Sequence, residues 1–322
     1  MSIAHADSAC GTGELDAHHA YDHVMNLVNS DPRAIAGTEI VVGPLAFGCW
    51  RMRAENDNRK LLETALGSGI NLVDTADIYG FNSDGNGFGD AERVLGDLLA
   101  GEPSLRERIV LATKGGITPP VPYDSSPDYL RAACEASLRR LRTDVIDIYL
   151  IHRPDVLTHP ESVAATLTEL RSSGKIREVG VSNYTVHQYE ALAAFLDFPI
   201  AATQPEFSVA HLDPIRDGTF DTAMRDGVAP LAWSPLGGGS LMTADAATDT
   251  TAAVLDRLAT REGVDRAAIA VAFVLAHPSR PVAILGTQRA ERLGAAIDAL
   301  GVHLDRNDCY DLIEASDSEP LP

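Results

Sequence analysis

The chain alternates between two kinds of segment, and this alternation restricts its fold more than any other feature. Eight short apolar segments of strand length are each followed by a segment whose apolar residues recur at helical spacing. We predict strands at 45–50, 71–74, 109–114, 145–152, 176–182, 200–204, 228–234 and 282–285. Helices are predicted around 61–66, 91–99, 127–141, 163–170, 186–196, 220–225, 252–262, 266–276, 289–300 and 306–315.

Strands that are each followed by a helix, over about 270 residues, are typical of a single (β/α)8 barrel. A doubly wound parallel sheet is the competing architecture. It predicts a G-x-G-x-x-G turn that opens a helix after an early strand, and the sequence contains no such turn. We therefore predict an α/β protein with one (β/α)8 barrel over 38–322, which ends in an additional helix.

The first 37 residues have a different composition. They are polar, rich in His, Asp and Ala, and show little periodicity beyond a possible short helix around 20–28. The segment 38–42 is a candidate for a small strand before the main fold. Because residues 1 to about 35 lack the apolar periodicity needed to bury much surface, we expect a tail that is not part of the barrel.

Composition excludes several classes of partner. The formal net charge is −20 and the isoelectric point is near 4.7, which argues against nucleic acid or an anionic membrane. No apolar run approaches the roughly 18 residues of a membrane helix. The four cysteines lie far apart without zinc-ligand spacing, and no export signal is visible, so we predict free thiols, no metal and a cytoplasmic protein.

Ionisable residues end three neighbouring strands of the predicted barrel. Asp74 follows the second strand, Lys114 the third and His152 the fourth, while Tyr79 lies in the loop after Asp74. The active site of such a barrel lies at the C-terminal ends of its strands. Asp74 alone is equally compatible with a turn residue, and His152 with a hydrogen-bonded histidine at a strand end. Lys114 is harder to dismiss, because a buried ammonium group needs a carboxylate partner.

These residue types suit proton transfer to an oxygen atom. A tyrosine hydroxyl has an ordinary pKa of about 10, and a neighbouring lysine charge lowers the pKa by stabilising the phenolate. Asp74 would keep Lys114 charged, and a neutral His152 would donate a hydrogen bond to a carbonyl oxygen. The constellation predicts general acid catalysis by Tyr79 during hydride transfer. Because no metal ligands are visible, the hydride is expected from an organic cofactor.

Six short motifs at the predicted strand ends resemble those of the aldo-keto reductases, and the similarity runs from about Leu45 to the last helix. They are Val-Asp-Thr-Ala-Asp-Ile-Tyr-Gly (73–80), Ala-Thr-Lys-Gly (112–115), Leu-Ile-His-Arg-Pro-Asp (150–155), Gly-Val-Ser-Asn-Tyr (180–184), Trp-Ser-Pro-Leu-Gly-Gly-Gly (233–239) and Ile-Leu-Gly-Thr (284–287). The resemblance implies NADPH-dependent reduction of an aldehyde or ketone, with Tyr79 as acid, Lys114 and Asp74 as the residues that tune it, and His152 as the residue that orients the carbonyl.

The same resemblance implies the residues that hold NADPH. Ser182, Asn183 and Gln204 would bind the carboxamide, and Trp233 would stack on the nicotinamide ring. The segment Ser234–Ser240, with Leu236 and Gly238, would cover the pyrophosphate. The adenosine phosphate is assigned to Gly286, Thr287, Gln288 and Arg292, with Arg289 as a second contact or a surface charge. Trp50 is expected to line the substrate pocket together with Tyr79 and His152.

Three positions depart from the family pattern. Trp233 replaces a more common tyrosine, and the loop Gly80–Gly89 is longer than expected, which predicts an altered substrate pocket. Ala295 and Ala296 stand where many relatives carry a Glu/Asn pair that contacts adenine. A regulatory subunit of the same fold, which binds NADPH without turnover, is the alternative function. The sequence leaves the substrate and the oligomeric state open.

Overall fold

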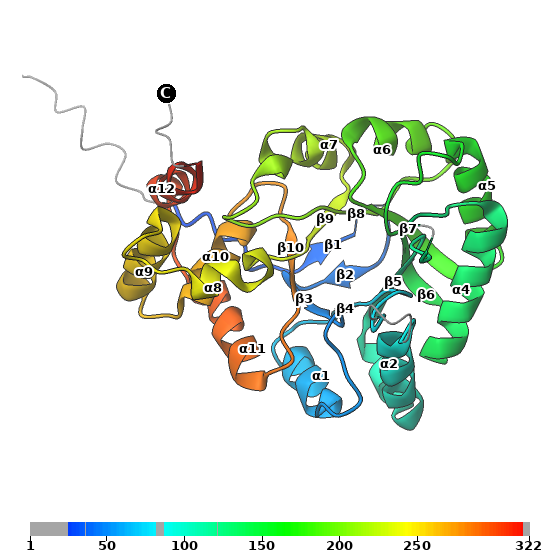
Figure 1. The fold of residues 1–322 in the computed structure, drawn as a ribbon, viewed down its shortest axis with the longest axis horizontal. Coiled ribbons are helices and arrows are strands. Elements are labelled where there is room, and N and C mark those ends of the chain that lie inside the picture. Colours follow the sequence, from blue (N-terminus) through cyan, green and yellow to red (C-terminus); the bar gives the residue numbers. More distant parts are fainter. Residues whose placement is uncertain (1–24, 36, 82–86, 121, 318–322) are drawn as a thin grey trace, which may run out of the picture.

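A closed barrel of parallel strands forms the centre of the computed structural model, which describes residues 25–35, 37–81, 87–120 and 122–317 (Figure 1). Each strand pairs with the next along the chain, and β10 pairs with β3 to close the ring. The barrel strands are β3 (Leu45–Gly48), β4 (Leu72–Asp74), β5 (Val110–Gly115), β6 (Ile146–Ile151), β7 (Ile176–Ser182), β8 (Ala202–Gln204), β9 (Ala229–Ala232) and β10 (Val282–Leu285). The (β/α)8 fold predicted from the alternation is confirmed.

Helices surround the barrel, as Figure 1 shows. They are α1 (Asn58–Gly67), α2 (Asp90–Gly101), α3 (Pro103–Arg108), α4 (Pro127–Leu141), α5 (Pro160–Ser172), α6 (Val186–Ala193), α7 (Thr219–Asp226), α8 (Ser240–Thr243), α9 (Thr250–Glu262), α10 (Arg266–Leu275), α11 (Ala290–Ile297) and α12 (Arg306–Asp317), with 3-10 turns η1 (Asp213–Ile215), η2 (Gly237–Gly239) and η3 (Asp298–Gly301). The short helices α3 and α8 were not predicted. The helix predicted over 289–300 is divided into α11 and η3.

Local sequence explains where several helices begin. At α4, Ser126 accepts a hydrogen bond from the Tyr129 amide, and Pro127 occupies the first helical position, where its missing N–H costs nothing. At α6, Thr185 and Gln188 form a reciprocal capping box. These caps fix the points at which the chain leaves the strand-end loops, and therefore the shape of the face that carries the predicted site.

A small hairpin covers the other end of the barrel. Strand β1 (Arg33–Ala34) pairs in antiparallel fashion with β2 (Val41–Val42). Ile35 and Val42 are fully buried and belong to the same apolar cluster as Leu72, a barrel residue. Because the cluster is continuous, the hairpin closes the N-terminal end of the barrel with its own apolar side chains.

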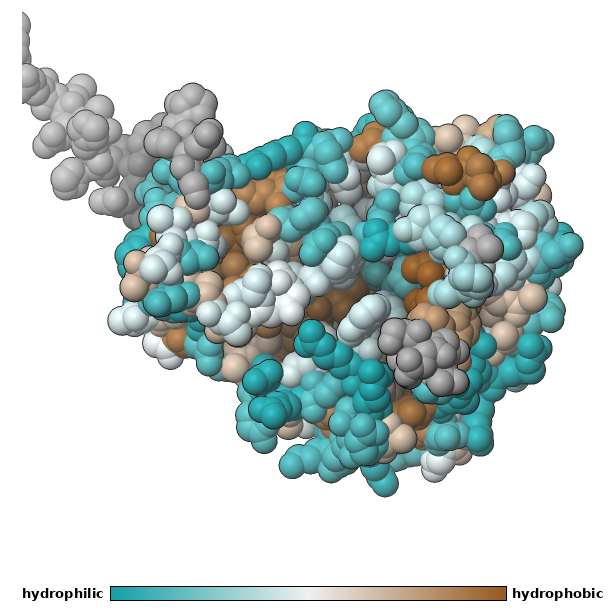
Figure 2. Space-filling model, in the orientation of Figure 1, coloured by the Kyte–Doolittle hydropathy of each residue, from teal (hydrophilic) through white to brown (hydrophobic). Residues whose placement is uncertain are grey.

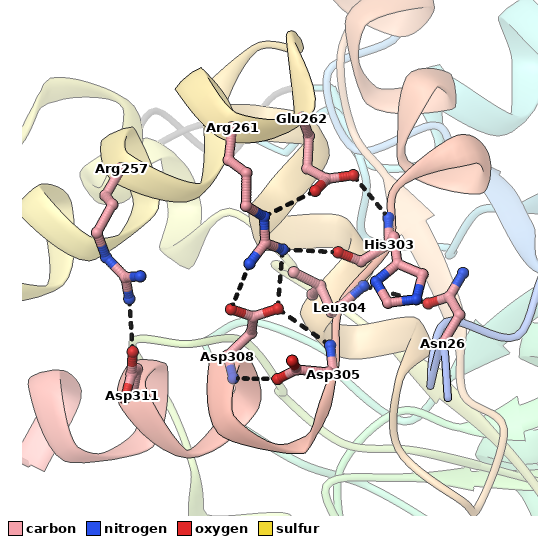
Figure 3. A network of polar contacts seen from close by, with 9 residues as sticks. All are labelled: Asn26, Arg257, Arg261, Glu262, His303, Leu304, Asp305, Asp308 and Asp311. Carbon is pink, nitrogen blue, oxygen red and sulfur yellow. Dashed lines mark hydrogen bonds and ion pairs between the residues drawn. The ribbon is translucent and has the colours of Figure 1, made fainter. Parts of the chain in front are cut away.

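The segment before the hairpin is also bonded to the barrel. The Arg33 guanidinium is buried and donates to the carbonyl oxygen of Pro281 at 2.7 Å. The Leu27 amide donates to the Leu304 carbonyl at 2.9 Å, and Asn26 bonds to the Leu304 amide beside the polar network that joins α9 and α12 (Figure 3). The expectation that residues up to about 35 stay apart from the barrel is therefore wrong for 26–35.

Two other expectations fall partly on residues that are not described. Residues 25–28 are not helical, and the rest of the helix considered for 20–28 lies outside the described residues. Cys49, Cys134 and Cys309 are free thiols as predicted, while Cys10 lies in the segment that is not described. No helix in the described part of the chain is long and apolar enough to cross a membrane.

Candidate active site

Lys114 lies at the centre of a buried polar cluster at the C-terminal end of the barrel. Its ammonium nitrogen is 2.7 and 2.8 Å from the two Asp74 carboxylate oxygens, and 2.8 Å from the Thr75 carbonyl oxygen. It also donates to the Tyr79 hydroxyl at 3.2 Å. The Gln204 side-chain amide donates to Asp74 at 2.9 Å from across the barrel. The structure thus joins the predicted acid to both of the residues predicted to tune it.

A tight turn carries the Tyr79 side chain back over the barrel. The Tyr79 amide donates to the Ala76 carbonyl, and Gly80 follows with a φ of +101°. A Cβ atom at Gly80 would lie 2.6 Å from the Gly87 carbonyl oxygen, so both the backbone angle and the space require glycine there. The Tyr79 ring is in edge contact with Trp50 and His152, at centroid distances of 5.0 and 5.8 Å.

Burial and neighbouring charges act in opposite directions on the pKa values of this cluster. Burial acts to lower the pKa of Lys114, but Asp74 and Tyr79 raise it by more, so the lysine stays charged. Burial also raises the pKa of Tyr79, which Lys114 lowers by a smaller amount. We expected the pKa of Tyr79 to fall below its ordinary value. That expectation is wrong in sign, because the hydroxyl is buried as well as close to a cation.

His152 is held as a neutral ring in edge contact with Tyr79. Burial and the charges of Lys114 and Arg153 place its pKa well below the ordinary value of 6.5. Its backbone amide donates to the Gly115 carbonyl at 2.8 Å, which fixes the end of β6. The ring nitrogen Nδ1 is buried without a partner in the described structure. A neutral imidazole suits hydrogen bonding to a carbonyl oxygen without adding a full charge.

The residues predicted to bind nicotinamide contact two of the predicted catalytic residues, Asp74 and His152, and bond to one another. The Asn183 side-chain amide donates to the Ser182 hydroxyl at 2.8 Å, and the Trp233 indole N–H donates to the Asn183 oxygen at 3.1 Å. Asn183 and Ser234 adopt left-handed backbone angles, with φ of +58° and +53°. Non-glycine residues rarely adopt these angles, and they are concentrated at functional sites.

One large cavity connects these residues, and the face of the molecule in Figure 2 is hollowed near its centre. Its volume is about 1860 Å³, above the roughly 300–1,000 Å³ of a pocket for one small ligand. Lys114 is the one predicted site residue that does not line it, because the lysine lies behind Asp74 and Tyr79. The predicted residues that line it are Trp50, Asp74, Tyr79, His152, Ser182, Asn183, Gln204, Trp233, Ser234, Leu236, Gly238, Gly286, Thr287, Gln288 and Arg292.

The cavity fits a dinucleotide together with a small substrate. A Cβ atom added at Gly238 or Gly286 would meet no atom within 4 Å, so the backbone there borders open space. The Gln288 side-chain oxygen is buried and has no partner among the described atoms. At the far end the wall is formed partly by Ala295 and Ala296, which offer no side-chain hydrogen bonds. The loop Gly80–Gly89 borders Tyr79, but residues 82–86 lie outside the described structure.

Sequence reasoning missed several polar residues of the cavity wall. Arg51, Arg53 and Arg153 line it, and none has a carboxylate partner in the described part of the chain. Two of them follow residues that were predicted, Trp50 and His152, and this adjacency was the available signal. Asp256 and Arg266 also line the cavity, and no motif marks them. The described residues contain no cluster of three or more His, Cys, Asp or Glu that could hold a metal ion.

Comparison with known proteins decides the family. The model of the aldo/keto reductase family matches residues 39–317. The chain belongs to this family. Its members are oxidoreductases that generally use nicotinamide cofactors to reduce small carbonyl compounds, which agrees with the size of the cavity and the residues around it.

Several relatives align over most of the chain. A 6-dehydroglucose reductase from Novosphingobium aromaticivorans is 49% identical, and the alignment covers 90% of this chain and 97% of the relative. Another 6-dehydroglucose reductase, from Agrobacterium fabrum, is 35% identical, with coverage of 87% and 96%. The oxidoreductase YdhF of Escherichia coli is 34% identical, with coverage of 86% and 94%.

A solved structure agrees with the fold. The thermostable aldo-keto reductase Tm1743, crystallised with the inhibitor epalrestat, superposes with a TM-score of 0.76 at 27% identity. The match covers 88% of this chain and 99% of Tm1743. The overall fold of this aldo/keto reductase is therefore similar to that of Tm1743.

Proposed function

We propose that this protein reduces an aldehyde to an alcohol with NADPH, and that Tyr79 donates the proton. NADPH, when bound, supplies the hydride that reaches the carbonyl carbon. The Tyr79 hydroxyl gives its proton to the carbonyl oxygen, and Lys114 stabilises the phenolate that is left. His152 donates a hydrogen bond that holds the carbonyl in place, and Asp74 keeps Lys114 charged. The observation that carries the proposal is the contact of one buried ammonium group with both Asp74 and Tyr79.

The raised pKa of Tyr79 supports its proposed role as a proton donor in carbonyl reduction. A hydroxyl whose pKa lies above 10 stays protonated at neutral pH, so it is ready to act as an acid rather than as a base. The nearby ammonium lowers the cost of the phenolate once the proton has moved. Lys114 therefore assists the product side of proton transfer without ionising Tyr79 in advance.

A hydroxylated aldehyde is the proposed substrate class. Two of the relatives are 6-dehydroglucose reductases, whose name describes a sugar with an additional carbonyl group. Close to Trp50 and His152, the cavity wall includes Arg51, Arg53 and Arg153. Guanidinium groups of this kind donate several hydrogen bonds at once, which suits several sugar hydroxyls better than an alkyl chain.

The experiment measures NADPH consumption with 6-dehydroglucose and with hexanal, which has the same carbon number but no hydroxyls. We expect a higher kcat/KM for the sugar. Tyr79→Phe should lower kcat by about two to four orders of magnitude and leave NADPH affinity unchanged. Tyr129→Phe is the matched control, because Tyr129 bonds to Asp77 outside the cavity lining. A kcat near the wild-type value in Tyr79→Phe would contradict the role of Tyr79 as the proton donor.

A further inference from the structure

Arginines without an ion pair are concentrated on the wall of the large cavity. Most arginines of the described residues pair with Asp or Glu. Those that line the cavity without such a pair are Arg51, Arg53, Arg153, Arg289 and Arg292. Outside the cavity lining, the described arginines without an ion pair are Arg33, Arg139, Arg280 and Arg306. In a chain with a net charge of −20 carboxylates are plentiful, so unpaired cations on one wall indicate an anionic ligand.

The carboxylates of the same wall are already engaged. Asp74 bonds to Lys114 behind the wall, and Asp256 binds the Arg266 guanidinium through both oxygens at 2.6 Å. Asp265 caps the N-terminus of α10. No other Asp or Glu of the described chain lines the cavity. The wall therefore carries positive charge that no neighbouring carboxylate cancels, within a strongly acidic protein.

These arginines form two groups at different places around the barrel. Arg289 and Arg292 follow β10, where the proposed function places the ribose phosphate of NADPH. Arg51 and Arg53 follow β3, while Arg153 follows β6. We call these last three residues the second arginine group. The cofactor contacts proposed above include none of them, so they are available for a different ligand.

The second arginine group comes from the two loops that contact the acid. Trp50 directly precedes Arg51, and the centre of its ring is 5.0 Å from that of the Tyr79 ring. His152 directly precedes Arg153, and its ring centre is 5.8 Å from that of the same tyrosine. Both loops therefore reach the end of the cavity at which the carbonyl group would react. A ligand of these arginines is expected to belong to the substrate.

Arg153 is the member of the group best placed to bind a ligand. It is only partly exposed, and its guanidinium makes no hydrogen bond to any described residue. The guanidinium carbon lies 5.9 Å from the centre of the Trp233 ring. Arg53 makes one hydrogen bond, to the Met52 carbonyl at 3.3 Å. Because a guanidinium has five N–H donors, most donors of both side chains are left for a ligand.

We propose that the second arginine group binds an anionic group of the substrate, which gives the enzyme a second substrate class: hydroxylated aldehydes that carry a carboxylate or a phosphate. The inference rests on the proposed function for the reduction itself. The carbonyl carbon accepts the hydride from NADPH, the carbonyl oxygen accepts the proton of Tyr79, and the anionic group is unchanged. A hydroxyl needs only a donor, whereas a carboxylate or phosphate also gains from the full charge and can take two parallel bonds from one guanidinium.

The experiment measures NADPH consumption with two pairs of aldehydes that differ in charge. D-Glucuronate and D-glucuronamide share every hydroxyl, and glyceraldehyde 3-phosphate is compared with glyceraldehyde. The wild type should show a kcat/KM about tenfold higher for the charged member of at least one pair, and the pair that responds distinguishes carboxylate from phosphate. Arg153→Gln should bring this ratio to about one, through a higher KM for the charged member. Arg53→Gln should reduce the ratio less.

Arg139→Gln is the matched control, because Arg139 on α4 also lacks an ion pair among the described residues but does not line the cavity. It should keep the wild-type charge ratio. NADPH affinity, measured by fluorescence titration without substrate, should be the same in Arg153→Gln, Arg139→Gln and the wild type. An unchanged charge ratio in Arg153→Gln would overturn the inference, and a simultaneous loss of NADPH affinity would place the arginine at the cofactor instead.

Two further outcomes separate this inference from the proposed function. A wild-type enzyme that reduces 6-dehydroglucose with NADPH but favours the charged member of neither pair would overturn the second substrate class alone. A wild-type enzyme that oxidises no NADPH with any of these aldehydes would overturn the proposed function and the inference together.

Discussion

A buried ammonium group is stable only where nearby oxygen atoms compensate for the loss of water. Lys114 is 0% exposed, and its nitrogen is within 3.2 Å of two carboxylate oxygens, a carbonyl oxygen and a hydroxyl. The same contacts make the lysine charge available to Tyr79. Stability and chemistry therefore depend on one side chain, so their responses to mutation should be coupled.

Replacement of Lys114 by Met tests this coupling. The variant removes the charge that stabilises the phenolate and leaves the buried Asp74 without its cation, so activity should be lost. Unfolding in urea should show a loss of about 3 to 5 kcal/mol. The double variant Lys114→Met with Asp74→Asn should recover part of this stability and none of the activity. Wild-type stability or turnover in the single variant contradicts the prediction.

His152 makes the free energy of unfolding depend on pH. Its pKa is well below 6.5 in the folded protein, so the unfolded chain takes up the proton first as the pH falls. The stability that the neutral ring contributes is full above about pH 6.5 and decreases below it, by roughly 1–2 kcal/mol at pH 5.

The difference in unfolding free energy between wild type and His152→Gln should therefore change between pH 8 and pH 5. Burial lowers the pKa of His277 to about 4, but this residue is present in both proteins and cancels in the comparison. His187→Gln is a comparison variant at an exposed position of α6, where no burial acts on the ring. A difference that stays constant with pH would show that His152 has the same pKa in the folded and the unfolded chain, which contradicts the lowered pKa.

The position of a single residue in the site could be predicted from the sequence where that residue follows the end of a barrel strand. Asp74, Lys114 and His152 each end an apolar run, and parallel strands in a barrel bring such ends together. The sign of the Tyr79 shift was not predictable, because it depends on how deeply the hydroxyl is buried. Arg266 was not predictable either, since its partners come from α8 and α9 and are brought together only by tertiary packing.

At the scale of elements, the turn between β10 and α11 carries the features on which we base the proposed phosphate site. Arg289 precedes the helix without capping it through its side chain, so the first amide groups of α11 remain available. Gln288 donates to the Gly48 carbonyl at 3.3 Å, which ties this turn to the end of β3. Arg289 and Arg292 both line the cavity from here. These groups supply local positive charge within a strongly acidic protein.

The proposed preference for NADPH over NADH can be tested at this turn. Arg292→Ala should weaken NADPH binding ten- to hundredfold, about 1.5–3 kcal/mol, because a charge-assisted bond to the ribose phosphate is lost. NADH lacks that phosphate, and its affinity should barely change. Arg289→Ala is the comparison, with a smaller expected effect. The measurement is a titration of both cofactors into each variant. Equal losses of affinity for NADPH and NADH in Arg292→Ala would contradict the assignment of Arg292 to the ribose phosphate.

Elements were predictable in proportion to their length and periodicity. The barrel strands and the long helices α4, α9 and α12 follow apolar patterns that extend over several residues. The two-residue strand β1 offers too few positions for a period, and its partner β2 was the half of the hairpin that the sequence suggested. The 3-10 turn η3, at the end of the helix predicted over 289–300, has no distinct sequence signal either.

For the whole molecule, the segment 26–33 joins the beginning of the described chain to its C-terminal part. Asn26 and Leu27 bond to residues between α10 and α12, and Arg33 bonds to the chain just before β10. These contacts join segments that are far apart in sequence, so they restrain the last strand and the last helix together. The active-site cavity is at the other end of the barrel, so the hairpin should affect stability rather than catalysis.

The last prediction therefore compares two deletions, of residues 1–24 and of residues 1–36. Their difference measures the segment that contains Arg33 and Ile35, and the longer deletion should have the lower melting temperature. Ile35→Ala should cost about 2–5 kcal/mol by itself, because Ile35 is fully buried in the apolar cluster inside the barrel. Since Ile35 does not line the cavity, kcat measured well below the melting temperature should stay near the wild-type value. Equal melting temperatures for the two deletions would show that the hairpin covers the barrel without stabilising it.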